Sequence, residues 1–165
     1  MSAVGGVVRA DVAFAAGGAD DPAATLRDGL ESRITFTLRC YRRQTGIAGL
    51  FGDRLLAERT VVRVAFYDVL DRRFVVEQDG ARASYADEDA FRAAFFTLRG
   101  IELAPAAPAR AGEAAGAAAA RYVAARAQYD PVRLSPPLTI LTLFGVAARY
   151  STPWVRGAVP GEDAS

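Results

Sequence analysis

Three acidic residues, Asp87, Glu88 and Asp89, lie side by side in the sequence. Neighbouring carboxylates can carry out general acid/base chemistry without a histidine, because one can hold a proton while another accepts one. The same residues precede an apolar pattern with helical spacing, so Asp87 also suits a helix N-cap and the other two suit the first turn. Helix capping is the simpler interpretation, and we do not expect an enzyme.

Several residue types needed for common catalytic chemistry are missing. The chain has no histidine, lysine or asparagine, so all 20 basic residues are arginine. This excludes a Ser-His-Asp or Cys-His arrangement, a Schiff-base or P-loop lysine, and a histidine-ligated metal. The single Cys40 cannot form an internal disulfide and is expected to be a small buried side chain. We therefore expect no cofactor and no metal site, and we attribute the arginine-only bias to a GC-rich genome.

Arginines gather near the end of one predicted strand, at Arg39, Arg42 and Arg43. Together with Arg59 and Arg63 on a neighbouring strand they form a candidate anion patch, since guanidinium groups suit phosphate and carboxylate. The alternative is a set of cross-strand ion pairs with Glu58, Glu77 and Asp79, and we favour it. The net charge of only +1 argues against a nucleic-acid surface.

The segment 44–53 combines three glycines with the apolar residues Ile47, Leu50 and Phe51. Such a loop either folds back on the body of the protein or is used for contact with a partner. We favour folding back, and keep Leu50 and Phe51 as possible contact residues.

A second apolar feature lies near the C-terminus, where Trp154 and Arg156 follow an apolar stretch within 138–144. An apolar segment with an aromatic and a cation at its end can lie on a membrane surface. Core packing is the interpretation we favour for this stretch. Trp154 and Arg156 remain candidate contacts for an apolar ligand or an anionic lipid surface.

The element that must position these residues is one strand that begins at Ile34. From there Ile34, Phe36, Leu38 and Cys40 alternate with polar residues, the period of a strand buried on one face. A register slip of one residue would bury the arginines, so the pairing of this strand is strongly specified. We expect it to be central in a sheet.

Further strands are expected at 7–14, 58–69, 74–78, 82–85 and 101–103, with Asp79-Gly80 as a type I′ hairpin turn. A short helix is expected after Asp21, and a longer one over 88–98, closed by Gly100. Segment 121–129 permits either helix or strand, and we choose strand, followed by a turn at Asp130-Pro131. A short helix is expected at 137–144.

A chain of 165 residues fits one domain with a sizeable core. We expect a single α+β domain over 1–156, mainly an antiparallel β-sandwich, with a low-complexity loop at 104–119 and a flexible tail at 157–165. No run of 18 apolar residues predicts a membrane-spanning helix. No basic segment followed by a long apolar run marks a signal peptide at the N-terminus.

The pattern of strands and turns resembles a bacterial family called domain of unknown function 4390, over about 7–156. The matching segments are 26–43, Gly52-Asp53-Arg54, 57–61, Phe74-Val75-Val76, 91–98, Pro136-Pro137-Leu138 and Thr152-Pro153-Trp154. Members usually begin with a signal sequence, so the resemblance implies export to the cell envelope or periplasm, although this sequence shows no such segment. The family has no assigned activity, and no functional residue carries over.

These observations predict a non-enzymatic interaction or structural module of the bacterial envelope. Its expected partner is another envelope protein, bound through an edge strand or the loop at Leu50-Phe51. The alternative is a binder of an apolar ligand or an anionic lipid surface. The oligomeric state is not predicted.

Overall fold

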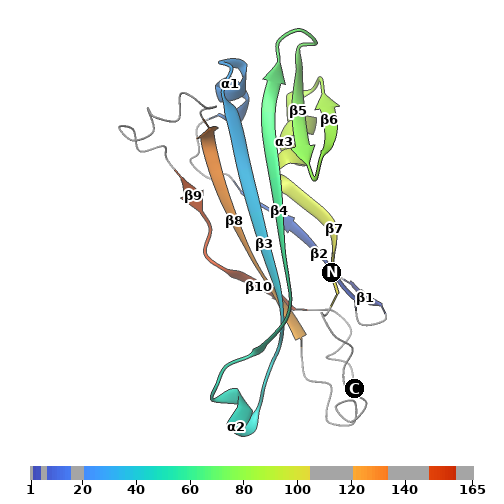
Figure 1. The fold of residues 1–165 in the computed structure, drawn as a ribbon, viewed down its shortest axis with the longest axis vertical. Coiled ribbons are helices and arrows are strands. Elements are labelled where there is room, and N and C mark those ends of the chain that lie inside the picture. The colour runs from blue at the N-terminus through green and yellow to red at the C-terminus, as the bar shows by residue number, and fades with distance from the viewer. Residues whose placement is uncertain (1, 5–6, 16–20, 105–120, 134–148, 159–165) are drawn as a thin grey trace.

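The computed structural model describes residues 2–4, 7–15, 21–104, 121–133 and 149–158 (Figure 1). Its strands are β1 (Ser2–Val4), β2 (Val7–Ala13), β3 (Glu31–Arg42), β4 (Arg54–Asp68), β5 (Arg73–Gln78), β6 (Ala81–Tyr85), β7 (Thr97–Leu103), β8 (Arg121–Arg133), β9 (Tyr150–Ser151) and β10 (Val155–Ala158). Its helices are α1 (Pro22–Arg27), α2 (Gly46–Gly49) and α3 (Glu88–Phe96). Every pairing among these described strands is antiparallel. None of these helices is long and apolar enough to cross a bilayer.

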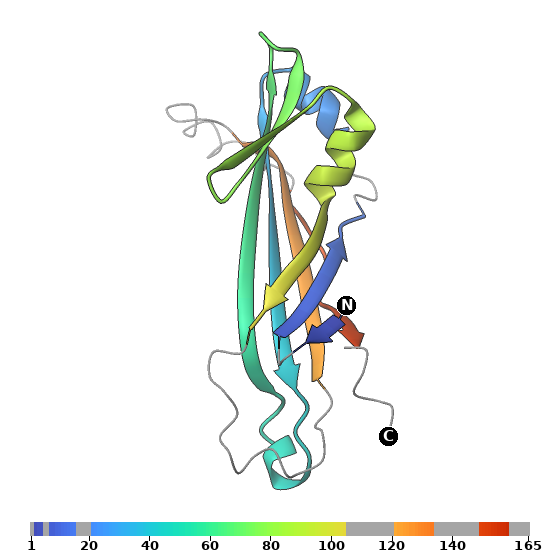
Figure 2. The ribbon, with the colours of Figure 1, turned by 90° about the vertical axis from the view of Figure 1, so that its right-hand side faces the viewer.

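Two sheets form the layers of the molecule. The large sheet has the strand order β10-β8-β3-β4-β5-β6, with β9 also paired to β8. The small sheet, β1-β2-β7, lies across one face of the large one, as Figure 2 shows. We call the face covered by the small sheet the inner face and the opposite one the outer face. The result is the α+β, sandwich-like architecture that the sequence predicts.

β3 is the central strand, as its alternation predicts. Ser32, Ile34, Phe36, Leu38 and Cys40 are all buried on its inner face. Burying a Leu- or Phe-sized side chain stabilises the fold by roughly 1.5 to 3 kcal/mol, so this one strand anchors much of the core. The long antiparallel ladders to β4 and β8 hold its register along nearly its whole length.

α3 begins where the sequence predicts and ends earlier. The Asp87 carboxylate accepts a hydrogen bond from the Ala90 amide at 2.8 Å, which is an N-cap. The helix does not continue to Leu98, and Gly100 does not close it, because Thr97–Leu103 pairs with β2 instead. Gly100 has φ +64° within β7, and its amide donates to the Asp11 carboxylate at 2.6 Å. Strand pairing with β2 therefore overrides the helical spacing after Phe96.

The hairpin turn at Asp79-Gly80 is confirmed, with φ values of +51° and +81°. Segment 121–129 is a strand, as predicted. The predicted turn at Asp130-Pro131 is wrong, because β8 continues to Arg133. The register of β8 against β3 shifts at this point, and the Ser32 hydroxyl donates to the Pro131 carbonyl at 2.6 Å. Proline is accommodated in a strand at such an irregularity, because no ladder hydrogen bond from its nitrogen is needed.

The predicted tail at 157–165 is wrong at its start, because Gly157 and Ala158 belong to β10. The rest of that tail lies outside the described residues. So do the predicted helix at 137–144 and nearly all of the predicted loop at 104–119.

Candidate functional site

The acidic cluster serves the fold. Asp87 caps α3, and Glu88 binds both Arg27 and Arg92 at 2.8 Å. Hydrogen bonds from Arg92 and Arg27 lower the pKa of Glu88, which favours a permanently charged carboxylate over one that exchanges protons near neutral pH. Within the described part of the chain, no group of three or more acidic or cysteine side chains is arranged to hold a metal ion.

The predicted arginine patch divides between the two faces of the sheet. Arg39 alternates out of the core on β3, whereas Arg59 and Arg63 lie on the inner face of β4. Arg63 is half-buried below α3, where it donates to the carbonyls of Ala94 and Thr97 and to the Gln78 side chain. Arg63 therefore closes the end of a helix and is not available to an external anion.

The predicted ion pair between Arg39 and Glu58 is confirmed, with Nε 2.8 Å from Oε2. This hydrogen bond and the negative charge of the Glu58 carboxylate raise the pKa of Arg39. Cross-strand pairing thus explains Arg39, as it explains the contact between Arg82 and Glu77 on the β5–β6 hairpin.

Three candidate residues from distant parts of the sequence come together on the outer face. In the register of the sheet, Ala124 of β8 lies opposite Arg39 on one side and opposite Arg156 of β10 on the other. The Arg39 guanidinium lies 4.8 Å from the ring centroid of Trp154, and the Arg156 guanidinium lies 5.2 Å from that of Tyr122. Cation–π contacts of this kind hold both guanidinium groups in place over aromatic faces.

Around Ala124 the outer face has a hollow of about 420 Å³, which we call the aromatic hollow. Its wall includes Tyr41 and Tyr122, whose rings stack at 5.3 Å, and the Tyr122 hydroxyl donates to Asp53 at 2.8 Å. The Gln44 amide and this hydroxyl lower the pKa of Asp53, so a negative charge stands beside the positive ones. The described residues that line it are Arg39, Tyr41, Gly52, Asp53, Tyr122, Ala124, Trp154 and Arg156. Charges of both signs therefore line the hollow.

A smaller hollow of about 200 Å³ lies between β2 and the edge formed by β8 and β10. Phe14, Val123 and Val155 contribute its apolar wall. Pockets for small apolar ligands usually measure about 300 to 1,000 Å³, so the described residues leave little room for such a ligand here.

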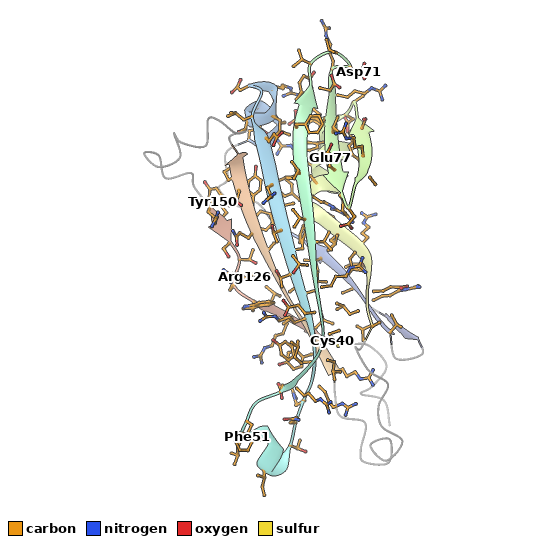
Figure 3. The ribbon with its side chains drawn as sticks, in the orientation of Figure 1. Cys40, Phe51, Asp71, Glu77, Arg126 and Tyr150 are labelled. Atoms are coloured by element: carbon orange, nitrogen blue, oxygen red, sulfur yellow. The ribbon has the colours of Figure 1, made fainter. Side chains whose placement is uncertain are left out.

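The loop at Leu50-Phe51 protrudes from one end of the molecule. Ile47, Leu50 and Phe51 are 80%, 83% and 88% exposed, and Figure 3 shows Phe51 at the far end of the β3–β4 hairpin. The favoured prediction that this loop folds back is therefore wrong. We call Ile47, Leu50 and Phe51 the apolar tip.

The base of this loop is well defined. The Gln44 amide donates to the Asp53 carboxylate at 3.1 Å across the hairpin. Gly46 and Gly52 adopt positive φ values of +65° and +89°. A side chain at Gly49 would bring its Cβ to 2.9 Å from the Gln44 carbonyl oxygen. These glycines shape a tight turn through α2 from which the tip residues point into solvent.

Four arginines surround the base of the apolar tip. Arg42 of β3 lies opposite Arg54 of β4 and also opposite Arg121 of β8, which makes one row across three strands. Arg43 follows directly and is exposed. We call these four residues the arginine collar. The sequence indicated Arg42 and Arg43 but missed Arg54 and Arg121, because only the strand register brings them into the same row.

Like charges directly opposite one another are destabilising in a sheet. Arg54 and Arg121 already make interactions within the protein, so this row is not a set of unpaired charges. The only acidic residue in segment 42–54 is Asp53.

Compared with protein families, with curated proteins and with solved structures, the chain matches none. The resemblance to domain of unknown function 4390 stays a prediction. What the structure defines is the class of fold: a mainly antiparallel, sandwich-like α+β protein with a protruding hairpin.

Proposed function

We propose that this protein is a non-enzymatic binding module and that the apolar tip is its contact surface. The observation that carries the proposal is the 80% to 88% exposure of Ile47, Leu50 and Phe51 in a single short loop. Isolated exposed apolar side chains are normal, but several in one small patch are typical of contact sites. A structured loop that keeps them in water favours a role in binding over a role in packing.

The chemistry of the chain supports a binding role. Glu88 and Asp87 are engaged in ion pairs and capping, and the chain lacks the histidine and lysine on which many catalytic sites depend. The aromatic hollow offers stacked rings and paired charges, which suit recognition of a surface more than bond-breaking chemistry.

We also propose that the module acts in the bacterial cell envelope. This part of the proposal is supported by the resemblance to domain of unknown function 4390 alone. Cell fractionation of the full-length protein, with marker proteins for each compartment, tests it, and recovery with the cytoplasmic marker would contradict it.

Photo-crosslinking from single positions tests the contact surface. A photoreactive amino acid is placed at position 50 in the apolar tip or at position 70, where Leu70 is 95% exposed in the β4–β5 turn at the opposite end. We expect adducts, to protein or to lipid, from position 50 and none above background from position 70. Equal yields from the two positions, or no adduct from position 50, would overturn the proposal.

A further inference from the structure

We infer that the apolar tip and the arginine collar together bind the surface of an anionic lipid bilayer. This inference rests on the proposed function and names the partner of the tip. Its basis is the juxtaposition of three exposed apolar side chains with four arginines at one end of the molecule.

The spacing of the two groups matches the depth of a membrane interface. Phe51 and Arg54 are three residues apart, which corresponds to at most about 11 Å of extended chain. Interfacial segments bury apolar side chains about 5 to 10 Å into the boundary between headgroups and acyl chains. With the tip at that depth, the collar lies at the level of the lipid phosphates.

The charge of this end complements an anionic surface. Segment 42–54 holds three arginines, Arg42, Arg43 and Arg54, and one acidic residue, Asp53, so its sequence carries a net charge of +2. Asp53 has a lowered pKa and keeps its charge at neutral pH. Arginine forks bind phosphate oxygens well, and the exposed Arg43 directly precedes the loop that carries the tip.

The size of the tip favours a membrane over a protein partner. A large side chain buries roughly 200 Å², so three of them supply less than the roughly 800 Å² per partner of a standard protein interface. A bilayer needs no complementary pocket, because its acyl chains adapt to a convex tip.

The opposite end of the molecule provides an internal control. Val69 and Leu70 are 69% and 95% exposed there, but the flanking Asp68 and Asp71 balance Arg72 and Arg73. The Asp68 carboxylate also accepts hydrogen bonds from the backbone amides of Leu70 and Asp71, and these bonds hold the turn together. Segment 68–73 therefore presents apolar side chains with a net charge of zero in its sequence.

A tryptophan at the tip reports insertion directly. Trp154 is first replaced with Phe, and Phe51→Trp or Leu70→Trp is added to that background. We expect the emission of Phe51→Trp to shift to shorter wavelength with vesicles of phosphatidylcholine and phosphatidylglycerol, and to stay unchanged with phosphatidylcholine alone. Leu70→Trp is expected to show no shift with either. Equal shifts for both positions, or none for Phe51→Trp, would overturn the inference.

Sedimentation with the same vesicles measures affinity. Leu50→Asp with Phe51→Asp is expected to abolish binding, whereas Leu70→Asp leaves it unchanged. Arg42→Gln with Arg43→Gln is expected to weaken binding roughly twenty-fivefold, because each arginine near an anionic surface contributes about a factor of five. Arg72→Gln with Arg73→Gln is the matched control and keeps wild-type affinity. Binding of the wild type is also expected to fall as salt increases.

Retained vesicle binding by the Leu50→Asp, Phe51→Asp variant would contradict the inference, provided that circular dichroism shows the variant folded. Crosslinks from position 50 to protein, combined with no sedimentation of the wild type, would refute the lipid partner and leave the proposed function intact. Absence of any crosslink from position 50 would refute both.

Discussion

The β3–β4 hairpin has two halves that carry similar side chains in opposite surroundings. Inside the sandwich, Phe36 and Leu38 are fully buried below the small sheet. Beyond the sandwich, Leu50 and Phe51 of the same hairpin are 83% and 88% exposed. The difference teaches that residue type alone does not separate core from contact surface: what counts is whether a second layer covers the hairpin at that point.

The arginines of the two halves differ in the same way. Arg63 reaches under α3 and donates to the carbonyls of Ala94 and Thr97. Arg43 stands exposed beyond the last paired residue of β3. One guanidinium completes the fold, and the other is available to a partner.

Substitution in the buried half should have the largest effect. Phe36→Ala is expected to lower the free energy of unfolding by about 3 to 5 kcal/mol, because it removes a fully buried ring and leaves a cavity. Urea denaturation followed by circular dichroism measures this change. A loss below 1 kcal/mol would mean that the two halves are not distinguished by burial.

Replacement of the half-buried Arg63 should have the next largest effect. Arg63→Met is expected to cost about 1 to 3 kcal/mol, because it leaves the carbonyls at the end of α3 without their donor. Arg43→Met is the matched control, and we expect its stability to equal that of the wild type. Similar losses in both variants would break the comparison between the two arginines.

Removal of the apolar tip should change stability little. Leu50→Ala with Phe51→Ala is expected to stay within about 0.5 kcal/mol of the wild type in urea denaturation, because both side chains are already in water. Loss of more than 1 kcal/mol would show that the tip packs against the protein, against the observed exposure.

The smallest effect concerns the pH dependence of the hairpin base. The hydrogen bonds from the Gln44 amide and the Tyr122 hydroxyl lower the pKa of Asp53 below its unfolded value. The resulting stabilisation is fully present above the unfolded pKa, near 4, and is lost as the pH falls through the lower folded value. An NMR titration of the Asp53 carboxyl should therefore show a midpoint below that of an unfolded peptide with the same sequence. A midpoint equal to or above the peptide's would contradict these hydrogen bonds, and Tyr122→Phe should move the midpoint upward.

Features that depend on a few neighbouring residues could be predicted from the sequence. The alternation from Ile34 to Cys40 indicated a strand with one buried face, Asp79-Gly80 indicated a turn with two positive φ values, and Asp87 indicated a helix start. Each of these depends on contacts within a few residues along the chain or on the intrinsic freedom of one residue.

The parts that failed depend on distant segments. α3 ends at Phe96 because β2 pairs with the following residues, and β8 continues past Pro131 because β3 accommodates an irregularity there. The sequence likewise predicted only part of the candidate site. Leu50, Phe51, Arg42 and Arg43 were identified, but their grouping with Arg54 and Arg121 depends on the strand register.

By itself the sequence determined several of the strands, including β3, β5 and β6, the hairpin turn at Asp79-Gly80 and the apolar face of β3, because side-chain periodicity and backbone preference act over short distances. Only the tertiary structure decided that Arg63 is enclosed, that Arg39 and Arg156 flank Ala124, and that the apolar tip stands in solvent. The physical reason is that strand register and layer coverage are set by burying the whole core at once. Local sequence patterns therefore do not predict where along the β3–β4 hairpin the cover of the small sheet ends.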